Sequence, residues 1–175
     1  MSKLSSKRIL VALFVAIASP LSFAQWSYKT HTDEMSDTTY ETASLRSNNS
    51  LDLEWPNKGG NFGTLFLSVR SDHSQQLMLH VQGGQIMCSE YAGCRIKVRF
   101  DRDPPLTFSG RQSPDGDTST ILFNHEDTFL SRALSAKSIL VEVQLYREGA
   151  RVLRFKTPAP IKRMSPDWPA STLPP

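Results

Sequence analysis

The side chains that most often perform catalysis are scattered along this sequence. The four histidines, His31, His73, His80 and His125, lie far apart, and none has the closely spaced histidine and carboxylate partners of a hydrolytic metal site. His80 alternates with apolar neighbours in a predicted strand, His73 lies in a predicted turn, and His125 begins a predicted helix. We therefore interpret all four as ordinary surface histidines.

Other catalytic patterns are also missing from the sequence. It contains no Gly-x-Ser-x-Gly motif, which would place a nucleophilic serine between a strand and a helix. The acid pairs Asp101/Asp103 and Asp115/Asp117 flank turns, where aspartate side chains stabilise the backbone. The segment from Asp115 to Asp117 is too short for a calcium loop. We predict no catalytic residue, no metal and no cofactor; a hydrolase assembled from residues distant in sequence stays an alternative.

The two cysteines, Cys88 and Cys94, are predicted to form a structural disulfide. A metal site would need histidines nearby, and a redox pair would need the closer Cys-x-x-Cys spacing. In an oxidising compartment two cysteines pair by default. The bridge would close a small loop, which stabilises a fold by about 2 kcal/mol. We expect it to staple the tip of a hairpin with Glu90 and Tyr91 at the apex.

Positive side chains alternate with apolar ones on two predicted strands. The outward positions of the first strand are Arg95, Lys97 and Arg99. The second stripe consists of Arg151, Arg154 and Lys156. If the two strands are neighbours, the stripes form a basic face that would bind an acidic partner, either a protein surface or an envelope polymer. The alternative is an ordinary solvated face, with Glu142 or Glu148 opposite the cations.

The N-terminus has the pattern of a secretory signal peptide. Lys3, Lys7 and Arg8 precede the apolar run 9–18, and a small-residue cleavage site ends at Ala24. The alternative, an uncleaved anchor, needs about 20 apolar residues. We therefore expect cleavage near Ala24 and a periplasmic or secreted bacterial protein with no membrane span after cleavage.

Cleavage would also change the charge of the chain. It would remove three of the 20 basic residues and none of the 17 acidic ones, so the mature chain would be neutral. Nucleic acid is therefore not an expected partner, because phosphate binding needs clustered excess charge.

Residues 25–156 are predicted to form a single β-rich domain, followed by a proline-rich, partly disordered tail over 157–175. Predicted strands cover 25–30, 39–45, 51–55, 63–70, 76–81, 85–88, 94–100, 106–108, 120–123, 139–146 and 151–156. One helix is predicted after a capping Asn124, with Phe129, Leu130, Ala133 and Leu134 as its apolar stripe. Turns rather than helices join the strands, which predicts an antiparallel β-sandwich or rolled sheet.

The order of several segments resembles small exported bacterial β-rich proteins of poorly defined function. The segments are an early Trp26, the 94–101 strand, the 113–115 turn before 121–123, the helix, and Phe155 near the end. The order is weakly similar to that of periplasmic accessory proteins encoded with type VI secretion systems. The resemblance spans residues 26–155 and implies an accessory role without catalytic residues. Those proteins end in Gly-Leu after the last strand, whereas this chain continues into its proline-rich tail.

These observations predict a non-enzymatic periplasmic binding or accessory protein that acts through protein–protein contacts in the cell envelope. Its expected partner is an envelope or periplasmic protein, bound by Arg95, Lys97 and Arg99. An immunity protein or inhibitor of an envelope-acting enzyme is the first alternative, with Glu90 and Tyr91 as the contact residues.

Overall fold

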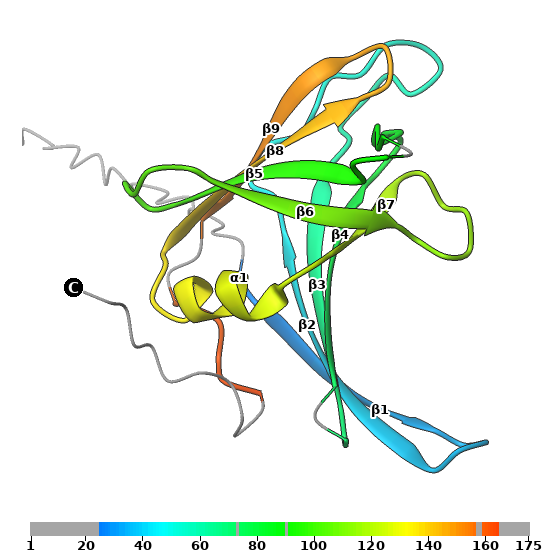
Figure 1. The fold of residues 1–175 in the computed structure, drawn as a ribbon, viewed down its shortest axis with the longest axis vertical. Helices are drawn as coiled ribbons and strands as arrows, with labels where there is room; N and C mark the ends of the chain where they lie inside the picture. Colours follow the sequence, from blue (N-terminus) through cyan, green and yellow to red (C-terminus); the bar gives the residue numbers. More distant parts are fainter. Residues whose placement is uncertain (1–24, 73, 90, 157–158, 165–175) are drawn as a thin grey trace, which may run out of the picture.

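The computed structural model describes residues 25–72, 74–89, 91–156 and 159–164. Within them, one nine-stranded sheet has the order β1-β2-β3-β4-β7-β6-β5-β8-β9, and one helix precedes β8 (Figure 1). The elements are β1 (Ser27–Asp33), β2 (Thr38–Arg46), β3 (Gly63–Arg70), β4 (Gln75–Val81), β5 (Cys94–Phe100), β6 (Leu106–Gln112), β7 (Thr120–Phe123), α1 (Glu126–Ala133), β8 (Ser138–Leu145) and β9 (Gly149–Lys156). All neighbouring strands pair antiparallel. The predicted signal peptide, His73, Glu90 and residues 165–175 lie outside the described residues.

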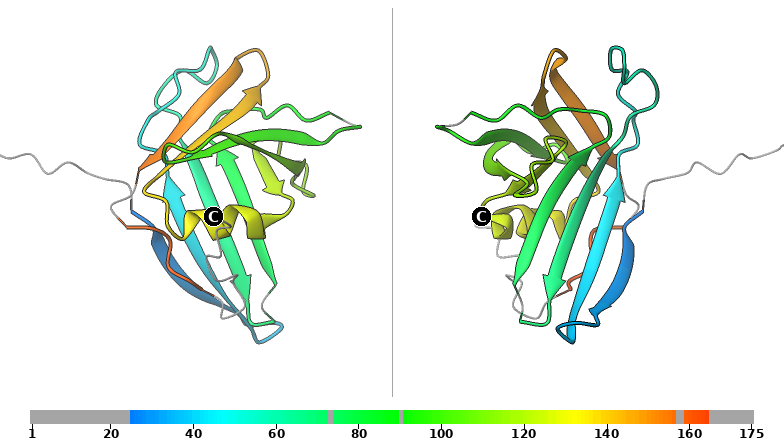
Figure 2. Two further views of the ribbon diagram at one scale, coloured as in Figure 1. Left: turned by 60° about the vertical axis from the view of Figure 1, so that its left-hand side comes forward. Right: turned by 90° about the vertical axis from the view of Figure 1, so that its right-hand side faces the viewer.

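The sheet is strongly rolled but not closed. Strands β5 and β6 cross over the layer formed by β1 to β4, as the views in Figures 1 and 2 agree. The two edge strands, β1 and β9, do not pair with each other in the described residues. Of the two predicted arrangements, the structure therefore adopts the rolled sheet.

The segment after β2 is hydrogen-bonded to the edge strand β9. Asn48 N donates to Arg154 O at 2.7 Å, and Asn49 Nδ2 donates to Val152 O at 3.0 Å. Arg154 N donates in return to Asn49 Oδ1 at 2.7 Å. Gly63, at the start of β3, lies so close to Leu153 that a larger side chain would overlap it. Asparagine amides thus satisfy backbone groups of β9 that a further strand would otherwise pair.

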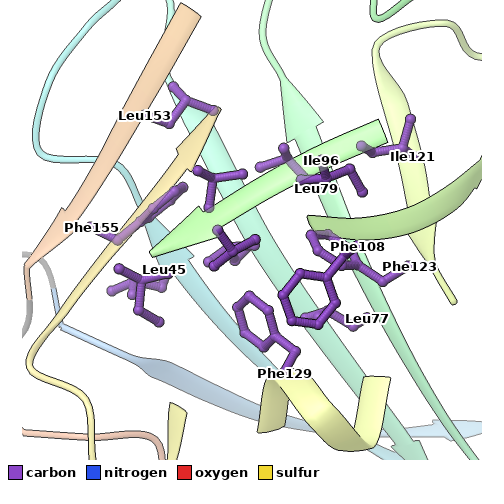
Figure 3. Close-up of a cluster of buried hydrophobic side chains, with 14 of the residues drawn as sticks. Leu45, Leu77, Leu79, Ile96, Phe108, Ile121, Phe123, Phe129, Leu153 and Phe155 are labelled. Carbon is purple, nitrogen blue, oxygen red and sulfur yellow. The ribbon is translucent and has the colours of Figure 1, made fainter. Parts of the chain in front are cut away.

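The core fills the inside of the roll. Alternating residues of β5 are buried, and Ile96, Val98 and Phe100 are at most 3% exposed, as the alternating sequence predicts. The inward residues of β8 are Ile139, Val141, Val143 and Leu145, each at most 1% exposed. Figure 3 shows buried side chains, such as Leu45, Leu79 and Phe155, that come from strands distant in sequence and meet in the core. Fully burying one of them contributes about 1.5–3 kcal/mol.

Helix α1 connects β7 to β8 and turns its apolar stripe into the core. Phe129 is fully buried, with ring centroids 6.0 Å from Phe108 and 5.4 Å from Phe123, both edge-to-face (Figure 3). The predicted capping role of Asn124 is wrong. His125 occupies the N-cap position at φ 58°, and Asn124 instead bonds to Ser109 through its backbone N–H and its side chain.

Residues 51–55 do not form the predicted strand. Leu51 makes a single bridge to Asn61, and Leu51 and Leu53 are buried as expected. Trp55, however, is 83% exposed. The chain turns after Glu54, whose carbonyl accepts from Asn57 N at 2.9 Å, so the alternation stops before it reaches Trp55.

Residues 85–88 also pair differently from the prediction. They run beside the end of β8, where Met87 N donates to Gln144 O and Tyr146 N donates to Gln85 O, both at 2.8 Å. Strand β5 pairs with β6 and β8 instead. The Cys88–Cys94 disulfide is confirmed, and it closes a tight antiparallel turn with a bridge between Ser89 and Gly93.

The described part of the tail packs against β1. Ile161 is 3% exposed and belongs to the core, and Lys162 N donates to the Tyr28 hydroxyl at 2.7 Å. Burial raises the pKa of that hydroxyl above its usual value, although the hydrogen bond from Lys162 opposes the shift. Across the described ranges, we find no helix with the length and apolar character needed to cross a membrane.

Candidate functional site

Cations from β5, β6 and β9 gather on the outer surface of the sheet on both sides of β8, which we call the basic outer face. Its members are exposed: Arg95, Lys97, Arg99, Arg111, Arg154 and Lys156. Strand β8 separates β5 from β9, so the two predicted stripes are not direct neighbours. The register nevertheless aligns Arg99, Leu140 and Arg154 in one row across the three strands. Because adjacent strands lie about 4.8 Å apart, the cations of β5 and β9 lie on either side of β8 on one surface.

One cation of each stripe is neutralised by a neighbouring acid. Lys97 Nζ lies 2.8 Å from Glu142 of β8, and Arg151 lies 2.7 Å from Glu148. These are the two acids that the sequence suggested as opposing charges. Among the residues that the structure describes, Arg95, Arg99, Arg111, Arg154 and Lys156 form no side-chain ion pair. The face therefore carries a positive excess, although the whole chain has a net charge of only +3.

Two hollows mark the centre of the basic outer face. The first, of about 310 Å³, is lined by Arg95, Lys97, Thr107 and Glu142, with Val143 and Gln144. The second, of about 290 Å³, is lined by Lys97, Arg99, Pro105, Leu140, Glu142 and Val152, with Val98. Arginine forks bind carboxylates in two-point geometry, and the partly exposed Leu140 and Val152 offer an apolar centre. The arrangement suits a partner with acidic groups around an apolar contact.

The disulfide-closed turn is a second exposed feature. Tyr91 is 99% exposed, and Ser89 Oγ accepts from the backbone N–H groups of Tyr91 and Ala92 at 3.3 and 3.2 Å. These bonds and the Cys88–Cys94 bridge fix the turn that presents the tyrosine. Its predicted companion, Glu90, lies outside the described residues. The turn leads directly into β5, so it lies at one end of the strand that carries Arg95.

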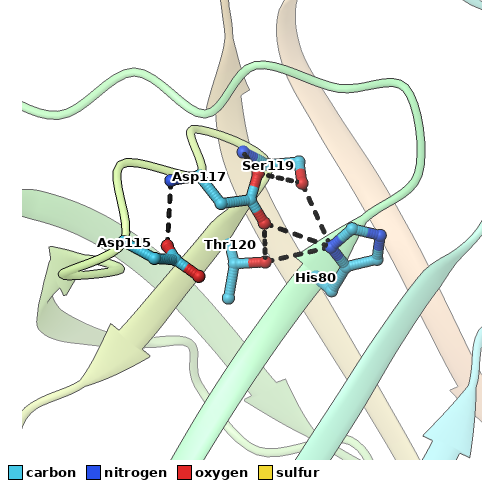
Figure 4. Close-up of polar contacts among 5 residues, drawn as sticks. All are labelled: His80, Asp115, Asp117, Ser119 and Thr120. Atoms are coloured by element: carbon cyan, nitrogen blue, oxygen red, sulfur yellow. Dashed lines mark hydrogen bonds and ion pairs between the residues drawn. The ribbon is translucent and has the colours of Figure 1, made fainter.

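Sequence reasoning missed a polar cluster around His80 (Figure 4). His80 of β4 is paired in register with Thr120 of β7, and its Nδ1 lies 3.0 Å from Thr120 Oγ1 and 3.1 Å from Ser119 Oγ. Both hydroxyls donate to Asp117 at 2.6 Å. Only the pairing of β4 with β7 brings His80 to this turn, and no sequence signal predicted that pairing.

The cluster stabilises a turn and lacks the arrangement of a catalytic triad. The hydroxyls of Ser119 and Thr120 lower the pKa of Asp117 to about 2, with smaller help from the Ser119 N–H and from His80, 3.9 Å away. In a triad the histidine stands between the acid and the nucleophile and takes the hydroxyl proton. Here both protons point to the carboxylate, so neither oxygen is activated by His80. The described residues also contain no group of three potential metal ligands.

Comparisons with protein-family models, with curated proteins and with solved structures found no match to this chain.

Proposed function

We propose that this protein is a non-enzymatic binding or accessory protein of the cell envelope. Its basic outer face would dock onto an acidic surface of an envelope protein. The supporting observation is the row of Arg99, Leu140 and Arg154, in which two cations flank a partly exposed leucine. Neither cation has an ion-pair partner among the described residues. Protein interfaces commonly combine such an apolar centre with arginine, and complementary charge guides the encounter.

Separate observations support the proposed location outside the cytoplasm. The signal-peptide pattern over 1–24 and the cleavage site at Ala24 are sequence features. The formed disulfide is compatible with an oxidising compartment outside the cytoplasm. Within this proposal, the resemblance to accessory proteins of type VI secretion systems suggests one cellular setting for the partner.

Site-specific crosslinking in the native envelope tests the docking face. A photo-reactive residue at Thr107, which is exposed beside Lys97 in the sheet register, should capture one protein. The same residue at Thr30, which is exposed on the edge strand β1, should not capture it. Mass spectrometry then identifies the captured protein, and the crosslinked peptide should be rich in Asp and Glu.

Charge removal provides the matched comparison. The triple variant Arg95→Ala, Lys97→Ala, Arg99→Ala should lose capture of that protein while its circular dichroism spectrum stays unchanged. The control removes three exposed cations elsewhere, at Lys29, Lys58 and Lys137. Capture that survives the first variant, or is lost equally in the second, would contradict the docking face.

The exposed Tyr91 favours one alternative, an immunity protein or an inhibitor of an envelope-acting enzyme. A tyrosine presented on a fixed turn is a common anchor of protein interfaces, because it buries a large area at little entropic cost. Tyr91→Ala should then abolish protection against the toxin while leaving the fold intact. A hydrolase is the third proposal, and the His80 cluster gives it no support.

A further inference from the structure

A pocket of about 220 Å³ lies apart from the hollows of the basic outer face. It forms where the loop between β2 and β3 meets the turn between β8 and β9, close together at the top of Figure 1. Its lining comes from residues 53–57, 83–85 and 146–148. None of these residues belongs to the basic outer face, and the predicted function assigns them no role.

Two exposed aromatic side chains border this pocket. Trp55 is 83% exposed, and Tyr146 is 49% exposed. The Arg147 guanidinium lies 5.3 Å from the Tyr146 ring centroid, within the range of a cation–π contact. Large aromatic groups gain free energy from burial, so two of them at one rim indicate a surface that a ligand covers.

The loop that carries Trp55 is held in place before any ligand binds. Glu54 N donates to Glu148 Oε1 at 2.6 Å, which ties the loop to the β8–β9 turn. Asn61 is 8% exposed, and its side chain donates to Asn57 O at 2.6 Å and to Gly59 O at 3.1 Å. A fixed loop loses little conformational entropy on binding, which favours affinity.

On the opposite wall of the pocket, Gly83 approaches the side chain of Asn61. Gly83 has φ 67°, a conformation that glycine adopts without strain, and a Cβ there would lie 2.7 Å from Asn61 Oδ1. The turn at Gly83 and Gly84 can therefore close against the loop only without a side chain. This close approach brings Gln85 to the same pocket as Asn57.

Most of the remaining side chains that line the pocket are polar. They include the amides of Asn57 and Gln85, the Glu54 carboxylate and the Arg147 guanidinium. The Glu148 carboxylate is already engaged by Arg151 and by Glu54 N. Amides both donate and accept hydrogen bonds, and carboxylates accept them, which matches the hydroxyls of a sugar. The apolar C–H face of a pyranose ring suits an aromatic ring. These hydrogen-bonding groups favour a hydroxyl-rich ligand over a proline-rich peptide, because proline has no backbone N–H to donate.

We infer that this pocket binds a neutral saccharide unit of a glycan, with Trp55 as the stacking platform and Asn57 and Gln85 as hydrogen-bonding partners. The inference goes beyond the proposed docking function and does not depend on the basic outer face. It implies that the protein contacts a glycan and a protein at separate surfaces.

Titration of the mature protein with an N-acetylglucosamine tetramer and with maltotetraose tests the inference. Amide NMR shifts should be confined to residues 53–57, 83–85 and 146–148 for at least one of the two sugars. Trp55→Ala should weaken that binding by about tenfold or more, as expected for an aromatic anchor. Tyr91→Ala removes an exposed tyrosine elsewhere and should leave the affinity unchanged.

The outcomes separate this inference from the proposed docking function. The Arg95, Lys97, Arg99 triple alanine variant should bind the sugar as the wild type does. No binding of either tetramer by the wild type, or equal binding by Trp55→Ala, would overturn the inference. Binding of a proline-rich peptide at the same amides without sugar binding would also overturn it, and would assign the pocket to a peptide.

Discussion

The basic outer face and the pocket lined by residues 53–57, 83–85 and 146–148, which we call the Trp55 pocket, are two surfaces built in opposite ways. The basic outer face consists of alternate residues on regular strands, whose other side is the core. The Trp55 pocket consists of a loop and two turns that are held by hydrogen bonds to Asn61 and Glu148. The comparison teaches that a strand surface gains its rigidity from apolar packing beneath it, whereas a loop surface needs specific buried polar groups.

The largest effect is expected beneath the basic outer face. Phe155 is fully buried, whereas the preceding residue, Arg154, points outward on the same strand. Phe155→Ala should lower the free energy of unfolding by about 3–5 kcal/mol, because it leaves a cavity. Arg154→Ala should change it by no more than about 0.5 kcal/mol. Urea denaturation followed by circular dichroism measures both.

The milder Phe155→Leu variant allows the same comparison if the alanine variant does not fold. Equal losses for the inward and outward substitutions would show that the face itself stabilises the fold. In that case, a loss of partner binding in the charge variants could not be attributed to the interface alone.

A smaller effect is expected beneath the Trp55 pocket. Asn61→Ala should lower the free energy of unfolding by about 1–3 kcal/mol, because Asn57 O loses the side-chain donor and Gly59 O keeps only the backbone N–H of residue 61. It should also weaken saccharide binding, since the loop that carries Trp55 is no longer fixed. Urea denaturation and sugar titration measure the two effects. Lys58→Ala, an exposed residue in the same loop, is the control. An unchanged sugar affinity in Asn61→Ala would break the comparison, because the loop would then not need its buried amide.

The smallest effect concerns the exposed turn at Asp117. Hydroxyl donation from Ser119 and Thr120 lowers its folded pKa from 3.8 to about 2. A lowered folded pKa means that Asp117 stabilises the fold above its unfolded pKa and loses this contribution as the pH falls from 3.8 toward about 2. Acid denaturation of Asp117→Asn should therefore depend less on pH in this window than that of the wild type. Asp52→Asn, which removes another exposed carboxylate, serves as the control. The pH dependence of the wild type retained in Asp117→Asn would refute the role of the turn.

Regular strands were the features that the sequence predicted best. In β5 the alternation of apolar and basic residues predicted both which residues are buried and which are exposed, and the structure agrees. The antiparallel β3–β4 hairpin and the disulfide are also confirmed. These features depend on neighbours along the chain, on the two-residue period of a strand, and on cysteine chemistry.

The misplaced features all involve competition between local and distant partners. Asn124 has the chemistry of a helix cap, but Ser109 takes its hydrogen bonds. Residues 85–88 have the composition of a hairpin arm that would pair with β5, but they hydrogen-bond to the end of β8 instead. Leu51 to Trp55 alternates like a strand, but the chain turns after Glu54 and leaves the tryptophan exposed. In each case the local pattern allows several partners, and the fold selects one.

The sequence by itself determined the fold class, the disulfide and the outward direction of Arg95, Lys97 and Arg99. Only the tertiary structure decided that β8 lies between the two basic strands, that Glu142 neutralises Lys97, and that Trp55 meets Tyr146 at one pocket. Side-chain direction follows from the local geometry of a strand, which each short segment already contains. The order of strands in a sheet follows from which distant segments bury the most apolar surface together, and that free energy belongs to the whole chain.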